Sequence, residues 1–181
     1  ISADGEYIVA GSDDDYVYLF NRNSSSPIWE YDTTGNVNSV DISADGEYIV
    51  AASNLKVYLF DKDSSTPEWT YTTSSVGTIW TVSISEDSNF ILAGDLNKVT
   101  HFFNKSSSTP LWTYSISDGY IYDSAISADG KYLVVSTVNS DNKIHTFKNQ
   151  VALRPSVIPY GPHIGSGVET PILRWFAGSD D

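Results

Sequence analysis

Short runs of hydrophobic residues alternate with clusters of polar turn residues along most of the chain. In one such stretch the runs cover residues 38–43, 47–53, 56–61 and 68–73, and Val, Ile, Tyr, Phe and Trp are frequent in them. Residues of these types favour strands, whereas the Gly, Pro, Asp and Ser between the runs favour turns. The stretch shows no helical spacing of apolar residues. The pattern therefore predicts units of four short antiparallel strands.

These units are near-copies of one another. The phrase ISADGEYIVAGS begins at Ile1 and returns in related form at Ile42, Ile84 and Ile126, a spacing of about 42 residues. Its Asp-Gly pair suits a tight hairpin between the first and second strands, because Gly and Asp tolerate positive φ. In the third unit Asp87 and Ser88 replace this pair, and there we expect a looser turn.

Two further phrases accompany the first, KVYLFD at residues 56–61 and SSTPEWTY at residues 64–71. Four antiparallel strands per ~40–45 residues match the blade of a β-propeller. The first phrase resembles the Ser-x-Asp-Gly-x-Tyr segment of WD-repeat, YVTN-type and TolB-like propellers. The segment VYLFDKDSSTPEWTY is similar to quinoprotein-like repeats. The chain departs from the typical WD repeat, since it has no Trp-Asp at the end of the third strand and no Gly-His pair.

The resemblance implies an all-β fold, a β-propeller with about four blades of four-stranded antiparallel sheets. Residues 1–148 would form the blades, with repeats that start near residues 1, 42, 84 and 126. Residues 149–181 would form an irregular tail rich in Pro and Gly, with one returning strand. The returning strand has two interpretations. TPILRW at 170–175 resembles the fourth strand of a blade, whereas AGSDD at 177–181 repeats residues 10–14 and indicates a further blade, which we favour.

The number of blades decides how the circular arrangement of a propeller is completed. The resembled families commonly have about seven or eight blades. We therefore expect an open arc of a larger propeller, either a fragment or a half that self-association with a second copy completes. A closed four-bladed ring is the alternative.

Charge and composition narrow the classes of function. The chain has 10 Lys and Arg against 23 Asp and Glu, a net charge of −13, and this opposes nucleic-acid binding because phosphate contacts need clustered basic side chains. It has no cysteine, which excludes disulfides, thiolate catalysis and Cys-type zinc sites. No apolar run approaches the ~20 residues of a membrane helix, so we expect no membrane insertion of this segment.

The most informative variation between units lies in the first strand, which lines the central channel of a propeller. The equivalent positions hold Asn38, Trp80 and Tyr122, followed by Ser39, Thr81 and Asp123. We expect these six residues to shape a surface for a protein or small ligand at the channel mouth, with Trp80 and Tyr122 as anchors. The alternatives are an exposed position under drift, or a Trp80 that packs between blades.

Carboxylates and imidazoles are the candidates for a metal site. Asp13, Asp14 and Asp15 form an acidic turn and are weak candidates for Ca²⁺, but the matching turns of other units lack the acids and favour a solvated turn. His101 and His145 occupy a position that holds Tyr in the first two units, so we interpret them as packing residues. His163 lies alone in the tail.

Motifs for catalysis are missing from the sequence. It has no Gly-x-Ser-x-Gly, phosphate-loop or dinucleotide fingerprint, and no Ser pairs with a His and an acid at recognisable positions. The quinoprotein resemblance suggests a quinone, but the acidic, Arg and Cys groups of such enzymes have no counterpart that we can place. We therefore expect no cofactor.

The prediction is a non-catalytic binding or scaffold module, part of a larger exported or cell-surface protein and hence extracellular. Glycosylation sequons at Asn23 and Asn104 fall in rim loops and would suit export. The first alternative is the propeller portion of an enzyme or a quinoprotein-like cofactor carrier whose active residues lie outside this segment. The second is a cytoplasmic interaction scaffold of the WD type.

Overall fold

The computed structural model describes residues 1–74, 77–117, 119–139 and 142–149. These residues form fourteen strands in four antiparallel sheets, and no helix occurs among them. The all-β prediction is therefore confirmed.

In every sheet the strands follow one another in chain order. The first sheet contains β1 (Tyr7–Gly11), β2 (Tyr16–Asn21) and β3 (Trp29–Asp32). The second contains β4 (Val37–Ile42), β5 (Tyr48–Ser53), β6 (Lys56–Asp61) and β7 (Trp69–Thr72). The third contains β8 (Ile79–Ile84), β9 (Phe90–Asp95), β10 (Val99–Asn104) and β11 (Trp112–Ser115). The fourth contains β12 (Tyr120–Ile126), β13 (Tyr132–Val138) and β14 (Ile144–Lys148).

The predicted strands agree with these bounds to within one residue at each end. The run 56–61 coincides with β6, and 38–43, 47–53 and 68–73 overlap β4, β5 and β7. The second and third sheets are the four-stranded blades that the repeat predicts, and the first and fourth have three strands each within the described residues.

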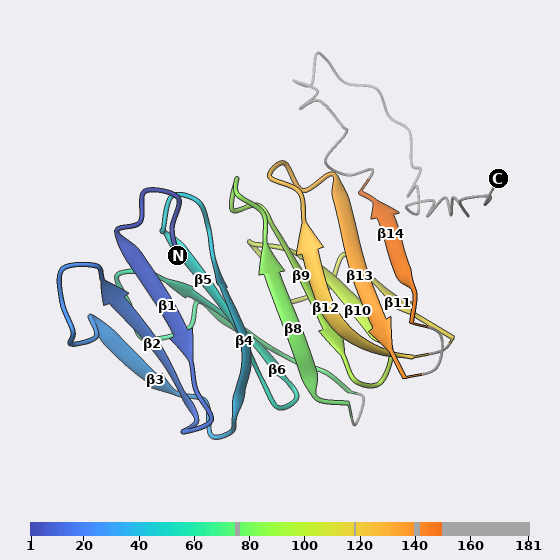
Figure 1. The fold of residues 1–181 in the computed structure, drawn as a ribbon, viewed down its shortest axis with the longest axis horizontal. Coiled ribbons are helices and arrows are strands. Elements are labelled where there is room, and N and C mark those ends of the chain that lie inside the picture. The colour runs from blue at the N-terminus through green and yellow to red at the C-terminus, as the bar shows by residue number, and fades with distance from the viewer. Residues whose placement is uncertain (75–76, 118, 140–141, 150–181) are drawn as a thin grey trace, which may run out of the picture.

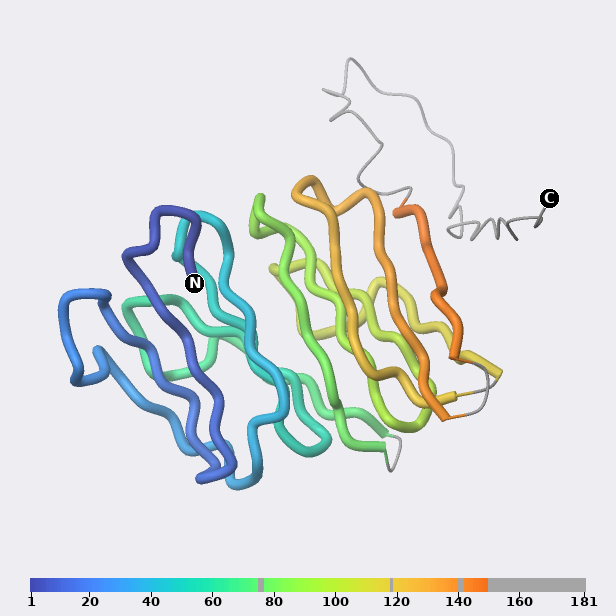
Figure 2. The backbone as a smooth tube through the Cα atoms, in the orientation of Figure 1, coloured from blue at the N-terminus to red at the C-terminus, as the bar shows by residue number. Residues whose placement is uncertain are grey.

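The four sheets stand next to one another in a row, with their first strands gathered on one side (Figure 1). Strand β8 lies between β4 and β12, and contacts both. The first and fourth sheets lie at opposite ends of the row, as the tube in Figure 2 also shows. The described residues thus form an arc of a propeller and not a closed four-bladed ring. The returning strand expected within 149–181 concerns residues beyond 149, which lie outside the described part.

A separate hydrophobic core fills each gap between neighbouring sheets. The core between the second and third sheets combines Val50, Val57 and Leu59 from one side with Ile84 and Phe103 from the other, all between 0% and 6% exposed. Each large apolar side chain buried in this way contributes about 1.5–3 kcal/mol. The sheets therefore stabilise one another face to face.

The Trp-x-Tyr of the fourth strand joins each blade to the next. Trp29 Nε1 donates a 2.7 Å hydrogen bond to the Lys62 carbonyl oxygen of the following sheet, and Trp69 Nε1 does the same to Lys105. Two residues further on, the rings of Tyr71 and Phe103 meet edge to face at 5.0 Å between centroids. The alternating burial along β7 places Trp69 and Tyr71 on one face of the sheet.

The Ser-x-Asp segment of the repeat fixes the hairpin after each first strand. Ser43 Oγ donates to Asp45 Oδ1 (2.6 Å) and accepts from the N–H of Tyr48 (3.0 Å), and Asp45 Oδ1 also accepts from the N–H of Glu47 (3.1 Å). Equivalent bonds recur in the other three units. This local network explains why the phrase is repeated so faithfully.

The expectation of a looser turn in the third unit is wrong. Ser88 adopts φ 62°, close to the 74° of Gly46, and its N–H donates to the Ser85 carbonyl oxygen at 2.9 Å, as in the other units. Asp87 forms the same bonds to Ser85 and Asn89 that Asp45 forms in the second unit. The Ser-x-Asp network, and not the glycine, holds the turn.

Candidate functional site

A bulge interrupts the first strand of three sheets at one equivalent position. The pairing register shifts between Val37 and Ser39, between Ile79 and Thr81, and between Ile121 and Asp123. The extra residues at these bulges are Asn38, Trp80 and Tyr122. A bulge leaves its extra residue outside the ladder and turns its side chain away from the regular alternation. The position that varies most between units is therefore the one that lies outside the regular pairing of the first two strands.

Two of these bulge residues form an exposed aromatic pair. Trp80 is 37% and Tyr122 is 56% exposed, and their ring centroids lie 6.4 Å apart with the planes inclined by 33°. They come from the adjacent inner strands β8 and β12. The alternative in which Trp80 is packed away between blades does not describe this geometry.

The remaining predicted residues divide into two groups. Asn38 Nδ2 donates to the Ile79 carbonyl oxygen (2.9 Å), and Ser39 Oγ accepts from the N–H of Val82 (3.2 Å). Thr81 is only 4% exposed and shares a 2.9 Å hydrogen bond with the hydroxyl of Ser124. These three side chains satisfy polar groups of the neighbouring inner strand.

Asp123 behaves differently. It is exposed, and its Oδ1 accepts from the N–H of Ser124 at 2.8 Å. Of the six predicted residues, Trp80, Tyr122 and Asp123 are thus available on the surface. Tyr120, at the start of β12, is 43% exposed and lies two positions from Tyr122.

Asp41 connects two neighbouring inner strands, and the sequence did not predict this role. Its Oδ2 accepts from the N–H of Ile84 in the next sheet (2.9 Å), and its Oδ1 accepts from the N–H of Ile42. Burial raises the pKa of Asp41 above the usual 3.8, against the lowering effect of these two hydrogen bonds. The available signal was its position, because the other units hold Ser83 and Ala125 there.

Two carboxylates of the acidic turn at residues 13–15 accept hydrogen bonds from other side chains of the protein. Asp13 Oδ1 accepts from Asn36 Nδ2 (3.0 Å), and Asp14 accepts from the Tyr18 hydroxyl (2.7 Å). The Tyr18 bond lowers the pKa of Asp14. Asp15 lies at φ 78° in the turn. Within the described ranges, no group of three or more His, Asp and Glu side chains is arranged to hold a metal ion.

His101 is buried in a polar chain that crosses two sheets. Its Nε2 lies 3.1 Å from Asp95 Oδ2, and its Nδ1 lies 3.3 Å from the hydroxyl of Tyr71. The neutral tautomer protonated at Nε2 satisfies both contacts. The ring also packs on Tyr71 at 5.3 Å. His101 is thus a packing residue, as predicted, and its buried carboxylate partner Asp95 was not predicted.

The other singled-out positions lie further from the inner strands. His145 is half-buried on β14, and His163 lies outside the described residues. Asn23 is exposed in its rim loop, whereas Asn104 is half-buried and its Oδ1 accepts from the N–H and hydroxyl of Ser106. Glycosylation of either asparagine stays a prediction.

Comparison with known families agrees with this architecture. The family model "WD domain, G-beta repeat" matches residues 1–21 and 25–61, which include the first sheet and most of the second. No curated protein is similar enough to the chain to count as a relative. The chain is therefore a β-propeller repeat protein whose first repeats resemble WD repeats. Propellers of this kind typically serve as non-catalytic modules for protein interaction. In the part of the chain with described coordinates, no helix has the length and apolar character to cross a membrane.

Proposed function

We propose that the chain is a non-catalytic interaction module that binds a protein partner on its inner strands, around Trp80 and Tyr122. The observation that carries the proposal is the exposed aromatic pair on two adjacent bulges. Trp and Tyr are the residue types that most often anchor interfaces, because they offer a large apolar area at a small entropic cost.

The surroundings of the pair support a binding surface. Tyr120 adds a third exposed ring on β12, and Asp123 adds an exposed carboxylate beside Tyr122. The side chains of Ser39 and Thr81 fasten the inner strands to one another underneath. A rigid backbone holding a few exposed aromatic groups reduces the entropy lost on binding.

An enzymatic role, the alternative, is not favoured by any observation on the described residues. The side chains of His101 and Asp95 form the pair that most resembles catalytic machinery, and they are 4% and 0% exposed. At these exposures neither side chain is open to a substrate. We accordingly infer no cofactor for the described blades.

We further propose that the module belongs to a larger exported or cell-surface protein. Its net charge of −13 and the sequon at the exposed Asn23 support this location. Secretion of the chain from a eukaryotic host tests the proposal: glycan attached at Asn23, with folding intact, supports it. A chain that folds only when made in the cytoplasm contradicts it and favours a cytoplasmic scaffold.

A peptide-display selection tests the binding surface. Random peptides are selected on the wild-type chain, and the affinities of the selected peptides are then measured for the double variant Trp80→Ala/Tyr122→Ala. We expect a loss of roughly tenfold or more, the effect of removing interface anchors. The matched control is Ile28→Ala/Leu111→Ala, which truncates two exposed apolar side chains on the outer rim. Equal binding to both double variants would remove the proposed site.

A further inference from the structure

Each end sheet of the row has one outward face. The equivalent face of an interior sheet is covered by its neighbour. Each inner interface joins the leading face of one sheet to the trailing face of the next. In the second sheet the leading face holds Tyr48, Val50, Val57 and Leu59, which pack on the third sheet. Its trailing face holds Ile49, Ala51, Tyr58 and Phe60, which pack on the first sheet.

The trailing face of the first sheet repeats the covered face of the second. Ile8, Ala10, Tyr18 and Phe20 stand at the positions of Ile49, Ala51, Tyr58 and Phe60. The four residues of the second sheet are at most 2% exposed, whereas the four residues of the first sheet are only half-buried. The same surface is therefore present twice, once covered and once open.

The aromatic side chains on this open face are already arranged as in the covered one. Tyr18 and Phe20 stack at 6.1 Å between ring centroids, against 6.0 Å for Tyr58 and Phe60. In the covered pair the Tyr31 ring of the preceding sheet lies edge-on at 5.1 Å from Phe60. The open pair has no preceding sheet among the described residues.

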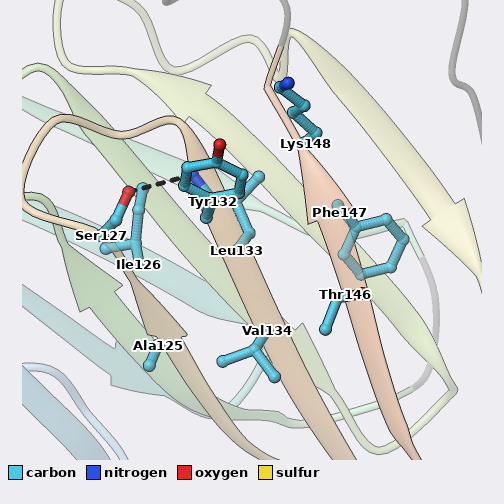
Figure 3. Close-up of a pocket in the computed structure, with 9 residues that line it drawn as sticks. All are labelled: Ala125, Ile126, Ser127, Tyr132, Leu133, Val134, Thr146, Phe147 and Lys148. Carbon is cyan, nitrogen blue, oxygen red and sulfur yellow. Dashed lines mark hydrogen bonds between the residues drawn. The ribbon is translucent and has the colours of Figure 1, made fainter. Parts of the chain in front are cut away.

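Within the described residues, the leading face of the fourth sheet is open and hollowed. Tyr132 is 58% and Ile144 is 72% exposed, beside the half-buried Val134. A hollow of about 480 Å³ lies over β12, β13 and β14, with Tyr132, Val134 and Thr146 among its lining residues (Figure 3). Next to it a smaller hollow of about 100 Å³ is lined in part by Val134 and Ile144. In the inner interfaces this space is filled by the next sheet.

In the inner interfaces an aromatic ring of one sheet packs on a turn glycine of the next. The two unpaired members of this contact lie at opposite ends of the row. A Cβ at Gly46 would lie 2.8 Å from the Tyr7 ring, and one at Gly130 would overlap the Phe90 ring, so each aromatic packs on the glycine of the next turn. Tyr132 corresponds to Tyr7 and Phe90, and among the glycines for which the structure gives contacts none points at its ring. Gly5 corresponds to Gly46 and Gly130, and a Cβ there would meet nothing within 4 Å.

The members of a cation–π contact between neighbouring sheets are also left unpaired at the two ends of the row. Lys105 Nζ of the third sheet lies 3.6 Å from the ring centroid of Tyr48 in the second. Arg22 occupies the position of Lys105 in the first sheet, and Tyr132 occupies that of Tyr48 in the fourth. A first sheet placed after a fourth would bring this pair together as well.

We propose that the leading face of the fourth sheet binds the trailing face of the first sheet of a second copy of this chain, head to tail. The interface repeats the packing that the corresponding middle strands of neighbouring sheets show in the three inner interfaces. Use of both ends by two copies gives a ring of eight sheets. The surface is separate from Trp80 and Tyr122, so it goes beyond the proposed binding function.

Analytical ultracentrifugation of the 181-residue chain and two end variants tests the proposal. The leading-face variant is Tyr132→Glu/Ile144→Glu, and the trailing-face variant is Tyr18→Glu/Phe20→Glu. The control is Ile28→Glu/Leu111→Glu on the outer rim. We expect the wild type and the rim control to self-associate and each end variant alone to be monomeric, with circular dichroism unchanged.

A mixture of the two end variants separates head-to-tail association from other modes. Each variant keeps one intact face, so the equimolar mixture should form heterodimers through the remaining leading and trailing faces. The mixture also shows that both variants are folded. A monomeric wild type at millimolar concentration, an end variant that dimerises alone, or a mixture that stays monomeric would each overturn the proposal.

Discussion

The imidazole of His101 and the carboxylate of Asp95 form a buried pair, with His101 Nε2 at 3.1 Å from Asp95 Oδ2. The other carboxylate oxygen, Oδ1, accepts from the N–H groups of Asn97 (2.9 Å) and Val99 (2.8 Å). In the second sheet the same two positions hold Ser53 and Tyr58. There Ser53 Oγ donates to the Gly35 carbonyl oxygen (2.6 Å) and the Tyr58 hydroxyl donates to the Thr33 carbonyl oxygen (3.2 Å), so the polar groups at this corner of the blade are satisfied in both versions.

A double-mutant cycle at these positions tests the coupling. Asp95→Ser alone should lower the free energy of unfolding by about 3 kcal/mol, because it leaves a buried imidazole without its acceptor. Adding His101→Tyr restores the combination of the second sheet and should recover part of the loss. Urea unfolding measures all four proteins. Additive losses in the double variant would show that the two positions are independent.

Two glycines in equivalent turns separate backbone strain from packing. Gly5 and Gly130 have φ 69° and 65°, so an alanine at either position carries similar backbone strain, about 1 kcal/mol. A Cβ at Gly130 also overlaps the Phe90 ring, whereas a Cβ at Gly5 meets open space. We expect Gly130→Ala to be more destabilising than Gly5→Ala by at least about 1 kcal/mol in dilute solution. Equal losses in thermal unfolding would mean that the sheets do not meet at this turn.

The Ser-x-Asp turns should differ in strength according to their burial. Ser43 is fully buried, and its hydroxyl links Asp45 to the N–H of Tyr48. Ser43→Ala should cost about 1–2 kcal/mol of unfolding free energy, because the partly buried N–H of Tyr48 loses its acceptor. Ser127 makes the same bonds in the fourth sheet, where they are exposed to water, and Ser127→Ala should cost less. A larger loss at Ser127 than at Ser43 would contradict this explanation.

Asp41 gives the unfolding free energy a pH dependence of known sign. Burial raises its pKa in the folded state above the usual 3.8, so the folded chain binds this proton more tightly than the unfolded chain does. The stability that Asp41 contributes is present below pH 3.8 and is lost as the pH rises through the raised pKa. The unfolding free energy of Asp41→Asn minus that of the wild type should therefore increase between pH 3 and pH 7.

Asp129 is the matched control with the opposite sign. A hydrogen bond from Lys131 lowers the pKa of this exposed carboxyl to about 2. Its contribution is present above pH 3.8 and is lost as the pH falls toward 2. The same difference for Asp129→Asn should fall with rising pH, and parallel curves for the two variants in urea titrations would refute the assignment.

The sequence predicted the strands well because each one is repeated. The run 56–61 coincides with β6, since the same alternation and the same bounding turns recur at a fixed spacing. The repeat also located the variable position of the first strand. It could not show that Asn38, Trp80 and Tyr122 sit on bulges, because a bulge depends on how two strands pair.

Contacts between residues in different sheets were beyond the sequence reasoning. Asp41 accepts from the N–H of Ile84, and the hydroxyl of Tyr71 contacts His101. The partners are 43 and 30 residues apart in the sequence. Asp41 does not recur at the equivalent positions, which hold Ser83 and Ala125, and His101 stands where the first two units hold Tyr, so no repeated phrase marks these contacts. The looser turn expected at Ser88 was wrong because the prediction weighed the glycine above the Ser-x-Asp bonds.

The repeats stack with their inner strands side by side, and a designed disulfide between two of these strands measures this arrangement. The hydroxyl oxygens of Thr81 on β8 and Ser124 on β12 lie 2.9 Å apart, and the chain has no cysteine of its own. Thr81→Cys/Ser124→Cys should close a disulfide under mild oxidation, with loss of both free thiols. Ser39→Cys/Ser124→Cys, whose strands are separated by β8, should stay reduced. A reduced first variant, or equal oxidation of both, would contradict the stacked arrangement.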